Sequence, residues 1–385
     1  MTSKQRLVTA LQRGRPDRLP VTTHHVMPFF LARQLAGATN DAFFAAFGLD
    51  PVHWIQAHRP DSARTDYPDP GHAPGYLEAQ RIASESWRVF AEEVSHPEFS
   101  TVRYRFVTPR KTLTTTLQSN ESTAWVIERL LKEKSDIDLI AEFATQPVCD
   151  VAAVNRAAEH YGESALIRGF VNGFDVYGQP GCWQDACVLF GVEEMILATF
   201  DDPGWVHAFL GILRDRKGRF VDSLAGARYD VIELGGGDAS STVISPQIFD
   251  EFVAPYDRAL VARAQAAGQR VVYHTCGGMM PILERVADLG VDAMETFTPP
   301  GLGGDMRLAE AKRRIGNRVC MIGGLDQSRF FMQSTEAETR AEVRRCFAAA
   351  GEGGGYILSP SDHFFEARPE LLRAFADEAR QCVYA

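Results

Sequence analysis

Two hydrophobic patterns alternate along most of this chain of 385 residues. Short runs of β-branched and aromatic residues, typical of buried strands, are each followed by a polar loop and a segment with helical periodicity. Repeated units of this kind predict parallel strands joined by crossover helices. We expect eight strands, which begin at Leu19, Val52, Ala165, Val231, Val271, Ala293, Val319 and Tyr356. Eight such units close into a (β/α)8 TIM barrel. The alternative is an open doubly wound sheet, but no glycine-rich dinucleotide fingerprint follows the first strand.

Strict alternation of polar and apolar residues distinguishes one stretch, at about residues 98–122, from the rest. Thr101–Val107 and Lys111–Gln118 both alternate and are joined by a short polar link, which predicts a β-hairpin with one face in water. We interpret this hairpin as an insertion into a single domain that spans residues 1–385 and has a helical extension at its N-terminus. A helix is also predicted over Trp125–Lys134.

The candidate chemistry lies at the ends of the predicted strands, since barrel enzymes carry their active sites at the C-terminal ends of the strands. All the expected strands except the second are followed by polar residues that could bind a metal or move a proton. These residues are His24 and His25, Asn172 and Asp175, Glu233 and Asp238, His274 and Cys276, Glu295, Asp326 and Gln327, and Asp362 and His363. Asp175 and Asp326 can equally be helix caps, because Asp commonly begins helices.

The stretch Gln269–Gly278, QRVVYHTCGG, carries the most specific pattern. Strand side chains alternate between faces, so His274 and Cys276 point to the same side. An imidazole and a thiolate are both zinc ligands. The alternative is a core histidine beside a buried free thiol. Candidates for a third ligand are His363, Asp362, Glu233, Asp238 and Cys320. We favour Asp362 or His363, because both follow the last strand.

Composition and charge exclude several classes of function. The net charge is −10 and no concentrated basic run is present, so nucleic acid is an unexpected partner. No stretch of about 18 apolar residues occurs, so no transmembrane helix is expected. The polar N-terminus does not resemble a secretory signal, and the seven scattered cysteines show no disulfide framework. We therefore expect a cytoplasmic protein.

Four segments of the sequence carry a resemblance to a known family. They are RLVTALQRGRPDRLPV (Arg6–Val21), HTCGGMMPILERVADLGVDAMETF (His274–Phe297), RVCMIGGLD (Arg318–Asp326) and YILSPSDHF (Tyr356–Phe364). Along nearly its whole length the chain resembles the uroporphyrinogen decarboxylase superfamily, and most closely its cobalamin-dependent (methylcobamide) methyltransferase branch. The resemblance implies the barrel fold and a zinc ion. It also implies methyl transfer between a substrate and a cobalamin or other corrinoid.

The sequence departs from this superfamily at two places. The decarboxylases carry arginines after the first strand to grip substrate carboxylates, whereas this chain has Thr22-Thr23-His24-His25. The methyltransferases have a second cysteine after the last strand, where this chain has Asp362 beside His363. A zinc site with one sulfur ligand is a harder Lewis acid than one with two, and it is better suited to polarising an ether or phenolate oxygen. No corrinoid-binding Asp-x-His-x-x-Gly motif is present, so a corrinoid would arrive on a partner protein, which we expect, or as the free cofactor.

These observations assign roles to the residues at the strand ends. Zinc is expected on His274 and Cys276 with Asp362 or His363. Acid–base or orienting roles are expected for His24, His25, Glu233 and Asp238. Contacts to the cofactor are expected from Asn172, Gly236, Gly324 and Asp326. The expected substrate is a small methyl donor, such as a methoxylated aromatic compound or a thioether, and a homodimer is compatible with the sequence.

Two other classes of function remain open. One is a lyase or decarboxylase that acts on a carboxylated substrate without a cofactor. Its carboxylate-binding residues would be Arg103, Arg105, Arg110 and Arg168, and the first three belong to the predicted hairpin. The other is a non-catalytic paralogue that binds a corrinoid or a metal.

Overall fold

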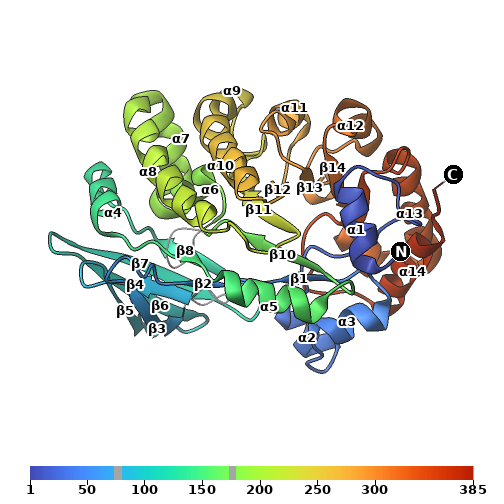
Figure 1. Cartoon of the computed structure of the whole chain (residues 1–385), viewed down its shortest axis with the longest axis horizontal. Helices are drawn as coiled ribbons and strands as arrows, with labels where there is room; N and C mark the ends of the chain where they lie inside the picture. The colour runs from blue at the N-terminus through green and yellow to red at the C-terminus, as the bar shows by residue number, and fades with distance from the viewer. Residues whose placement is uncertain (73–79, 173–178, 385) are drawn as a thin grey trace.

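A curled parallel sheet forms the centre of the protein (Figure 1). The computed structural model describes residues 1–72, 80–172 and 179–384, and of residues 69–72 and 80 only the backbone is described. Seven parallel strands lie side by side in this described part of the chain. In spatial order they are β1 (Val52–Trp54), β10 (Leu166–Phe170), β11 (Val231–Gly235), β12 (Val271–His274), β13 (Ala293–Thr296), β14 (Cys320–Leu325) and β15 (Tyr356–Pro360).

The eighth strand, expected at Leu19–Thr23, is reduced to a single parallel bridge between Val21 and Leu358 of β15. On its other side the Val21 carbonyl accepts a hydrogen bond of 2.7 Å from the Asp50 N–H, just before β1. Pro20 has no N–H to donate, and the Val21 N–H bonds the Asp50 side chain, so a longer ladder cannot form. This segment still joins β15 to β1, and the expected (β/α)8 barrel is confirmed with a minimal first strand.

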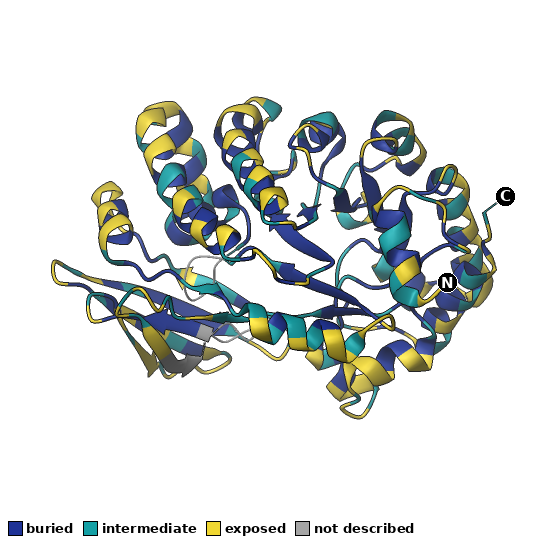
Figure 2. Cartoon of the chain, viewed as in Figure 1, coloured by how far each residue is buried: buried dark blue, intermediate teal, exposed yellow. Residues whose placement is uncertain are grey.

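Helices lie outside the sheet, with their buried faces toward the strands (Figure 2). In α14, for example, Leu371, Leu372 and Phe375 are buried at helical spacing. None of the described helices is long and apolar enough to cross a bilayer. The α-helices are α1 (Ser3–Leu11), α2 (Pro28–Gln34), α3 (Asn40–Phe47), α4 (Ile137–Phe143), α5 (Val151–Tyr161), α6 (Cys182–Phe190), α7 (Val192–Asp201), α8 (Pro203–Asp222), α9 (Pro246–Ile248), α10 (Ala254–Ala266), α11 (Leu283–Ala287), α12 (Leu308–Ile315), α13 (Glu336–Ala350) and α14 (Pro369–Gln381). Shorter helical turns are η1 (Lys134–Asp136), η3 (Gly237–Ala239), η5 (Met280–Ile282) and η6 (Pro300–Leu302), and π-helical turns are η4 (Phe249–Val253) and η7 (Arg329–Gln333).

An antiparallel sheet projects from one end of the molecule (Figure 1). Its strands are β5 (Arg88–Glu93), β6 (Ser100–Val107), β7 (Thr112–Ser119) and β8 (Ala124–Glu128). Two further antiparallel sheets have two strands each: β3 (Tyr67–His72) pairs with β4 (Gln80–Ala83), and β2 (His58–Arg59) pairs with β9 (Val148–Cys149). The expected hairpin is present as β6 and β7. The helix predicted over Trp125–Lys134 is wrong, because Trp125 and Val126 pair with β7 in strand β8. Aromatic and β-branched residues fit a pleated surface, and this pairing outweighs the helical spacing.

One buried carboxylate holds the N-terminal segment against the barrel. Asp50 is fully buried and accepts hydrogen bonds from Arg6 (2.6 Å), from both terminal nitrogens of Arg18 and from the Val21 N–H (3.0 Å). Each oxygen of the carboxylate is therefore paired with a cation. The minimal first strand depends on this residue rather than on a backbone ladder.

We predict that Asp50→Asn lowers the free energy of unfolding by about 3 kcal/mol, because Arg18 loses its carboxylate partner and Arg6 keeps only its pair with the more exposed Asp17. Urea denaturation measures this change. Glu121→Gln is the control, since the Glu121 pair with Arg33 is exposed on both sides and contributes little. Equal stability of the two variants would contradict the anchoring role of Asp50.

Candidate metal centre and active site

Strand β12 places His274 at the C-terminal end of the barrel. Val271, Val272 and Tyr273 are buried β-strand residues, and the register aligns His274 with Glu295 of β13. Aligned residues on adjacent parallel strands point to the same side of the sheet. The sequence of β12 and β13 therefore brings an imidazole and a carboxylate together inside the barrel mouth.

Three side chains of different chemistry converge there, and we call His274, Cys276 and Asp362 the metal group. The Cys276 sulfur lies 3.1 Å from Nε2 of His274 and 2.8 Å from Oδ2 of Asp362. Their possible ligand atoms all lie within 4.8 Å of one another. Ligand atoms around a tetrahedral zinc lie roughly 3.5 Å apart, given bonds of about 2.0 Å to nitrogen and 2.3 Å to sulfur. The three residues therefore fit a zinc ion after small outward shifts.

The predicted ligand His363 has a different position. Its Nδ1 lies 2.9 Å from Oδ1 of Asp362, and its backbone N–H donates to the same oxygen at 2.7 Å. Asp362 thus uses one oxygen to bind His363 and turns the other toward Cys276. Of the two alternatives for a third ligand, the geometry favours Asp362, with His363 as the residue that orients it.

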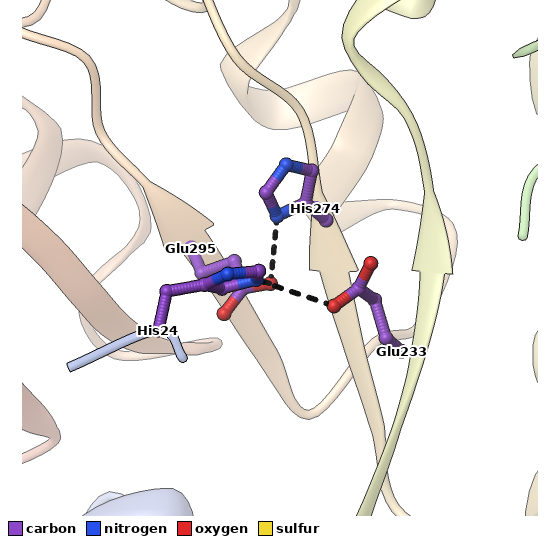
Figure 3. A group of neighbouring side chains, drawn as sticks. All are labelled: His24, Glu233, His274 and Glu295. Atoms are coloured by element: carbon purple, nitrogen blue, oxygen red, sulfur yellow. Dashed lines mark hydrogen bonds and ion pairs between the residues drawn. The ribbon is translucent and has the colours of Figure 1, made fainter. Parts of the chain in front are cut away.

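His274 is oriented by a hydrogen bond on its other ring nitrogen. Nδ1 of His274 donates to Oε1 of Glu295 over 2.9 Å (Figure 3). This bond directs Nε2 toward Cys276. A carboxylate on the far nitrogen is the usual support for a metal-binding histidine, because it fixes the tautomer and the ring plane.

Beneath the metal group lies a second cluster, which we call the carboxylate group: His24, Glu233, His274 and Glu295 (Figure 3). Arg168 of β10 pairs with both glutamates, and its Nη1 donates to Oε2 of Glu295 over 2.8 Å. The Arg168 side chain is only 5% exposed. The guanidinium is thus buried between two carboxylates.

His24 and His25 extend this cluster toward the mouth. Nε2 of His24 lies 3.2 Å from Glu295 and 3.4 Å from Glu233, and its Nδ1 lies 2.6 Å from Nδ1 of His25. Burial opposes charging of His24, but the two carboxylates outweigh it and raise its pKa. Burial and the neighbouring His24 lower the pKa of His25 well below its usual value. His24 therefore donates a proton to a neutral His25.

The charges of the metal group suit cation binding. Burial opposes ionisation of Asp362, but the bond from His363 and the nearby His274 hold its pKa well below the ordinary value. Burial raises the pKa of the Cys276 thiol to about 11. The thiol is therefore protonated in the metal-free site and donates to Asp362. A bound metal would replace that proton, since the thiolate is the form that coordinates.

Comparison with known proteins shows where this site belongs. Residues 108–382 match the family model described as uroporphyrinogen decarboxylase (URO-D). The chain belongs to the uroporphyrinogen decarboxylase family. The uroporphyrinogen decarboxylase of Neisseria meningitidis is 35% identical over 188 residues, which are 47% of this chain and 50% of that protein. That of Thioalkalivibrio sulfidiphilus is 28% identical over 191 residues, with 47% and 50% covered. The chain thus spans about half the length of the curated relatives it matches.

This chain also shares its fold, over nearly its whole length, with a solved methyltransferase. The methyltransferase from Methanosarcina mazei covers 99% of this chain and 99% of its own, with a TM-score of 0.60 and 17% sequence identity. This likeness supports the barrel and its strand order. The expected superfamily is confirmed by the match of residues 108–382 to the URO-D family model.

Several residues predicted for the site lie outside both groups. Asp238, on η3, contacts Gln184 and Trp183 through its main chain, and burial raises its pKa. The Asn172 carbonyl accepts a bond from Lys217, and Oδ1 of Asp326 accepts from the Arg329 N–H as a helix cap. Gly236 packs against Gln184, Gly324 packs against Leu308 at positive φ, and Cys320 is buried in the core. Their contacts are those of structural residues, while the roles predicted for Asp238, Asn172, Gly236, Gly324 and Asp326 stay predictions. Asp175 lies outside the described residues.

Sequence reasoning missed the part that three residues play in the site. Arg168 was considered only as a residue that binds a substrate carboxylate. Glu295 was named only as one of the polar residues at the strand ends. The third is Trp54, whose ring lies 4.3 Å from the Arg168 guanidinium and whose Nε1 donates to the His24 carbonyl over 2.9 Å. A charged residue inside the apolar strand ALIRGFV was the available signal, because a buried arginine requires buried anionic partners.

The buried carboxyl group of Asp257 contacts Tyr273 of β12. The Tyr273 hydroxyl donates to Oδ2 of Asp257 over 2.7 Å, and the Cys182 N–H donates to Oδ1 over 3.4 Å. Burial raises the pKa of Asp257 to about 6. An unfolded Asp titrates near 3.9, so the folded protein binds an additional proton between about pH 4 and pH 6.

We predict that Asp257 makes the protein lose stability as the pH rises through about 6. Its contribution is fully present below about pH 4, and the loss is on the order of 2–3 kcal/mol. Asp257→Asn removes the titration. Urea denaturation from pH 4 to pH 7 should show the wild type falling relative to this variant. If the free energies of unfolding of the wild type and of Asp257→Asn change with pH in parallel, Asp257 does not titrate in this range.

Proposed function

We propose that this URO-D family protein is a zinc-dependent methyltransferase that moves a methyl group between a small methylated substrate and a corrinoid. The observation that carries the proposal is the convergence of His274, Cys276 and Asp362 at the barrel mouth. A nitrogen, a sulfur and an oxygen are three protein ligands, the number that catalytic zinc sites use together with one water or substrate ligand. The corrinoid would be supplied by a partner protein.

The donor set indicates the type of substrate. Bound zinc would act as a Lewis acid that polarises the heteroatom carrying the methyl group and stabilises the demethylated anion. One sulfur among N and O ligands favours an oxygen atom over a thiol at the open position. The His25 ring lies beside the site, with its centroid 6.0 Å from that of Trp54 and 5.1 Å from that of His363. We therefore infer a methoxylated aromatic compound as the substrate class.

His24 supplies the acid of the proposed reaction. Glu233 and Glu295 hold its imidazole, and its ring centroid lies 4.9 Å from that of His274. A proton on His24 is thus close to the position where a phenolate would form. His25, which accepts from Nδ1 of His24, keeps the donor ring in place. Proton delivery of this kind typically contributes 10²–10⁴-fold to the rate.

Decarboxylation without a cofactor is the second candidate, because the curated relatives are named uroporphyrinogen decarboxylase. Such a reaction needs cations that are free to bind substrate carboxylates. Arg168 is already paired with two glutamates. Arg103 and Arg105 belong to β6 of the antiparallel sheet, and Arg110 pairs with Glu142. The structure thus gives this candidate less support than methyl transfer.

We predict one equivalent of zinc in the wild-type protein, measured by elemental mass spectrometry after metal loading and gel filtration. His274→Ala, Cys276→Ala and Asp362→Ala should each lose it, because each removes a ligand. His363→Ala should retain zinc with an affinity about 10–100-fold lower, as expected for a residue that orients a ligand. Cys320→Ala is the matched thiol control and should retain one equivalent. Full retention by Cys276→Ala would contradict the proposed ligand set.

We also predict that the zinc-loaded protein transfers a methyl group from methoxylated aromatic compounds to reduced cobalamin, detected by the absorbance change of methylcobalamin formation. His24→Gln should lower this rate by about 10²-fold or more while zinc content stays the same. Release of carbon dioxide from a carboxylated substrate without methyl transfer would favour the decarboxylase. Bound zinc with neither reaction would favour a non-catalytic carrier.

A further inference from the structure

The two groups at the barrel mouth share one histidine, whose Nδ1 faces Glu295 and whose Nε2 faces Cys276. His274 belongs both to the metal group with Cys276 and Asp362 and to the carboxylate group with His24, Glu233 and Glu295. The atoms that could bind a metal lie within 4.8 Å of one another in each group. Two carboxylates and two imidazoles would by themselves attract a divalent cation. A property of the site must therefore decide whether metal enters one group or both.

Arg168 already fills the carboxylate group with a positive charge. Its guanidinium bonds Glu233 and both oxygens of Glu295, so its single positive charge offsets one of their two negative charges. A metal ion in the same group would meet the guanidinium at close range in a buried environment, where repulsion between like charges is strong. The metal group lies on the opposite side of His274, where Asp362 supplies a negative charge.

The guanidinium is also fixed in place. The Trp54 ring covers it at 4.3 Å, and Trp54 is itself held by its bond to the His24 carbonyl. A cation stacked on an aromatic face and paired with two carboxylates cannot turn away without losing both interactions. The charge of Arg168 is therefore a constant feature of the site rather than one of several side-chain positions.

We infer that Arg168 is a specificity-determining residue that reserves the metal for His274, Cys276 and Asp362 by occupying the carboxylate group as a built-in cation. The inference rests on the proposed zinc site. It assigns Arg168 a role toward the metal rather than toward a substrate carboxylate. It also accounts for Glu295, which bonds the guanidinium and His274 at once and so turns Nε2 of His274 to the metal group.

The test compares Arg168→Gln, which keeps a hydrogen-bond donor but removes the charge, with Arg168→Lys, which keeps the charge. Cobalt(II) serves as the probe, because thiolate coordination gives a charge-transfer band in the near ultraviolet. We expect one equivalent with this band in the wild type and in Arg168→Lys. Arg168→Gln should bind a second equivalent, and Arg168→Gln with Cys276→Ser should bind one equivalent without the band.

The other outcomes separate the inference from the proposed function. A single equivalent in Arg168→Gln, with the same thiolate band as the wild type, would overturn the role of Arg168 alone. Cobalt bound to the wild type without a thiolate band would also overturn it, because the metal would then occupy the carboxylate group. A wild type that binds no divalent metal would remove the zinc proposal and this inference together. If Arg168→Gln does not fold, Arg168→Gln with Glu233→Gln is measured in the same way, because the second change removes one of the two carboxylates left without a cation.

Discussion

The carboxylate of Glu295 links the fold of this protein to its chemistry. One oxygen accepts from His274 and pairs with Arg168, and the other accepts from Arg168 as well. Glu295 is 2% exposed, so its charge is tolerated only because these partners surround it. Removal of one partner from such a buried cluster is strongly destabilising, typically by about 3–5 kcal/mol. The orientation of His274, the burial of Arg168 and the position of His24 therefore depend on one another.

The barrel makes this cluster possible by aligning strands that are far apart in sequence. Arg168, Glu233, His274 and Glu295 come from the consecutive strands β10, β11, β12 and β13. Parallel strands deliver their C-terminal ends to one side, where loops add Cys276 and Asp362. The arrangement gives two layers: a charged cluster between the strands and a metal group above it. In the proposed function the lower layer orients ligands and holds protons, and the upper layer binds the metal and the substrate.

The parallel strands from residue 150 onward could be predicted because buried strands are continuous apolar runs between turns. The first strand was predicted too long, because the replacement of its ladder by the Asp50 side chain has no local signature. Strand β8 was mistaken for a helix, since its pairing with β7 is not encoded in its own periodicity. His274 and Cys276 were recognisable from their spacing. The pairing of Arg168 with Glu295 joins residues 127 apart, so no spacing rule could reveal it.

The most direct test of the central claim, that a metal binds His274, Cys276 and Asp362, is X-ray absorption spectroscopy at the zinc edge. The proposed site predicts one sulfur neighbour at about 2.3 Å together with nitrogen and oxygen neighbours at about 2.0–2.2 Å. A zinc shell of nitrogen and oxygen alone would contradict it, because the metal would then be bound without Cys276.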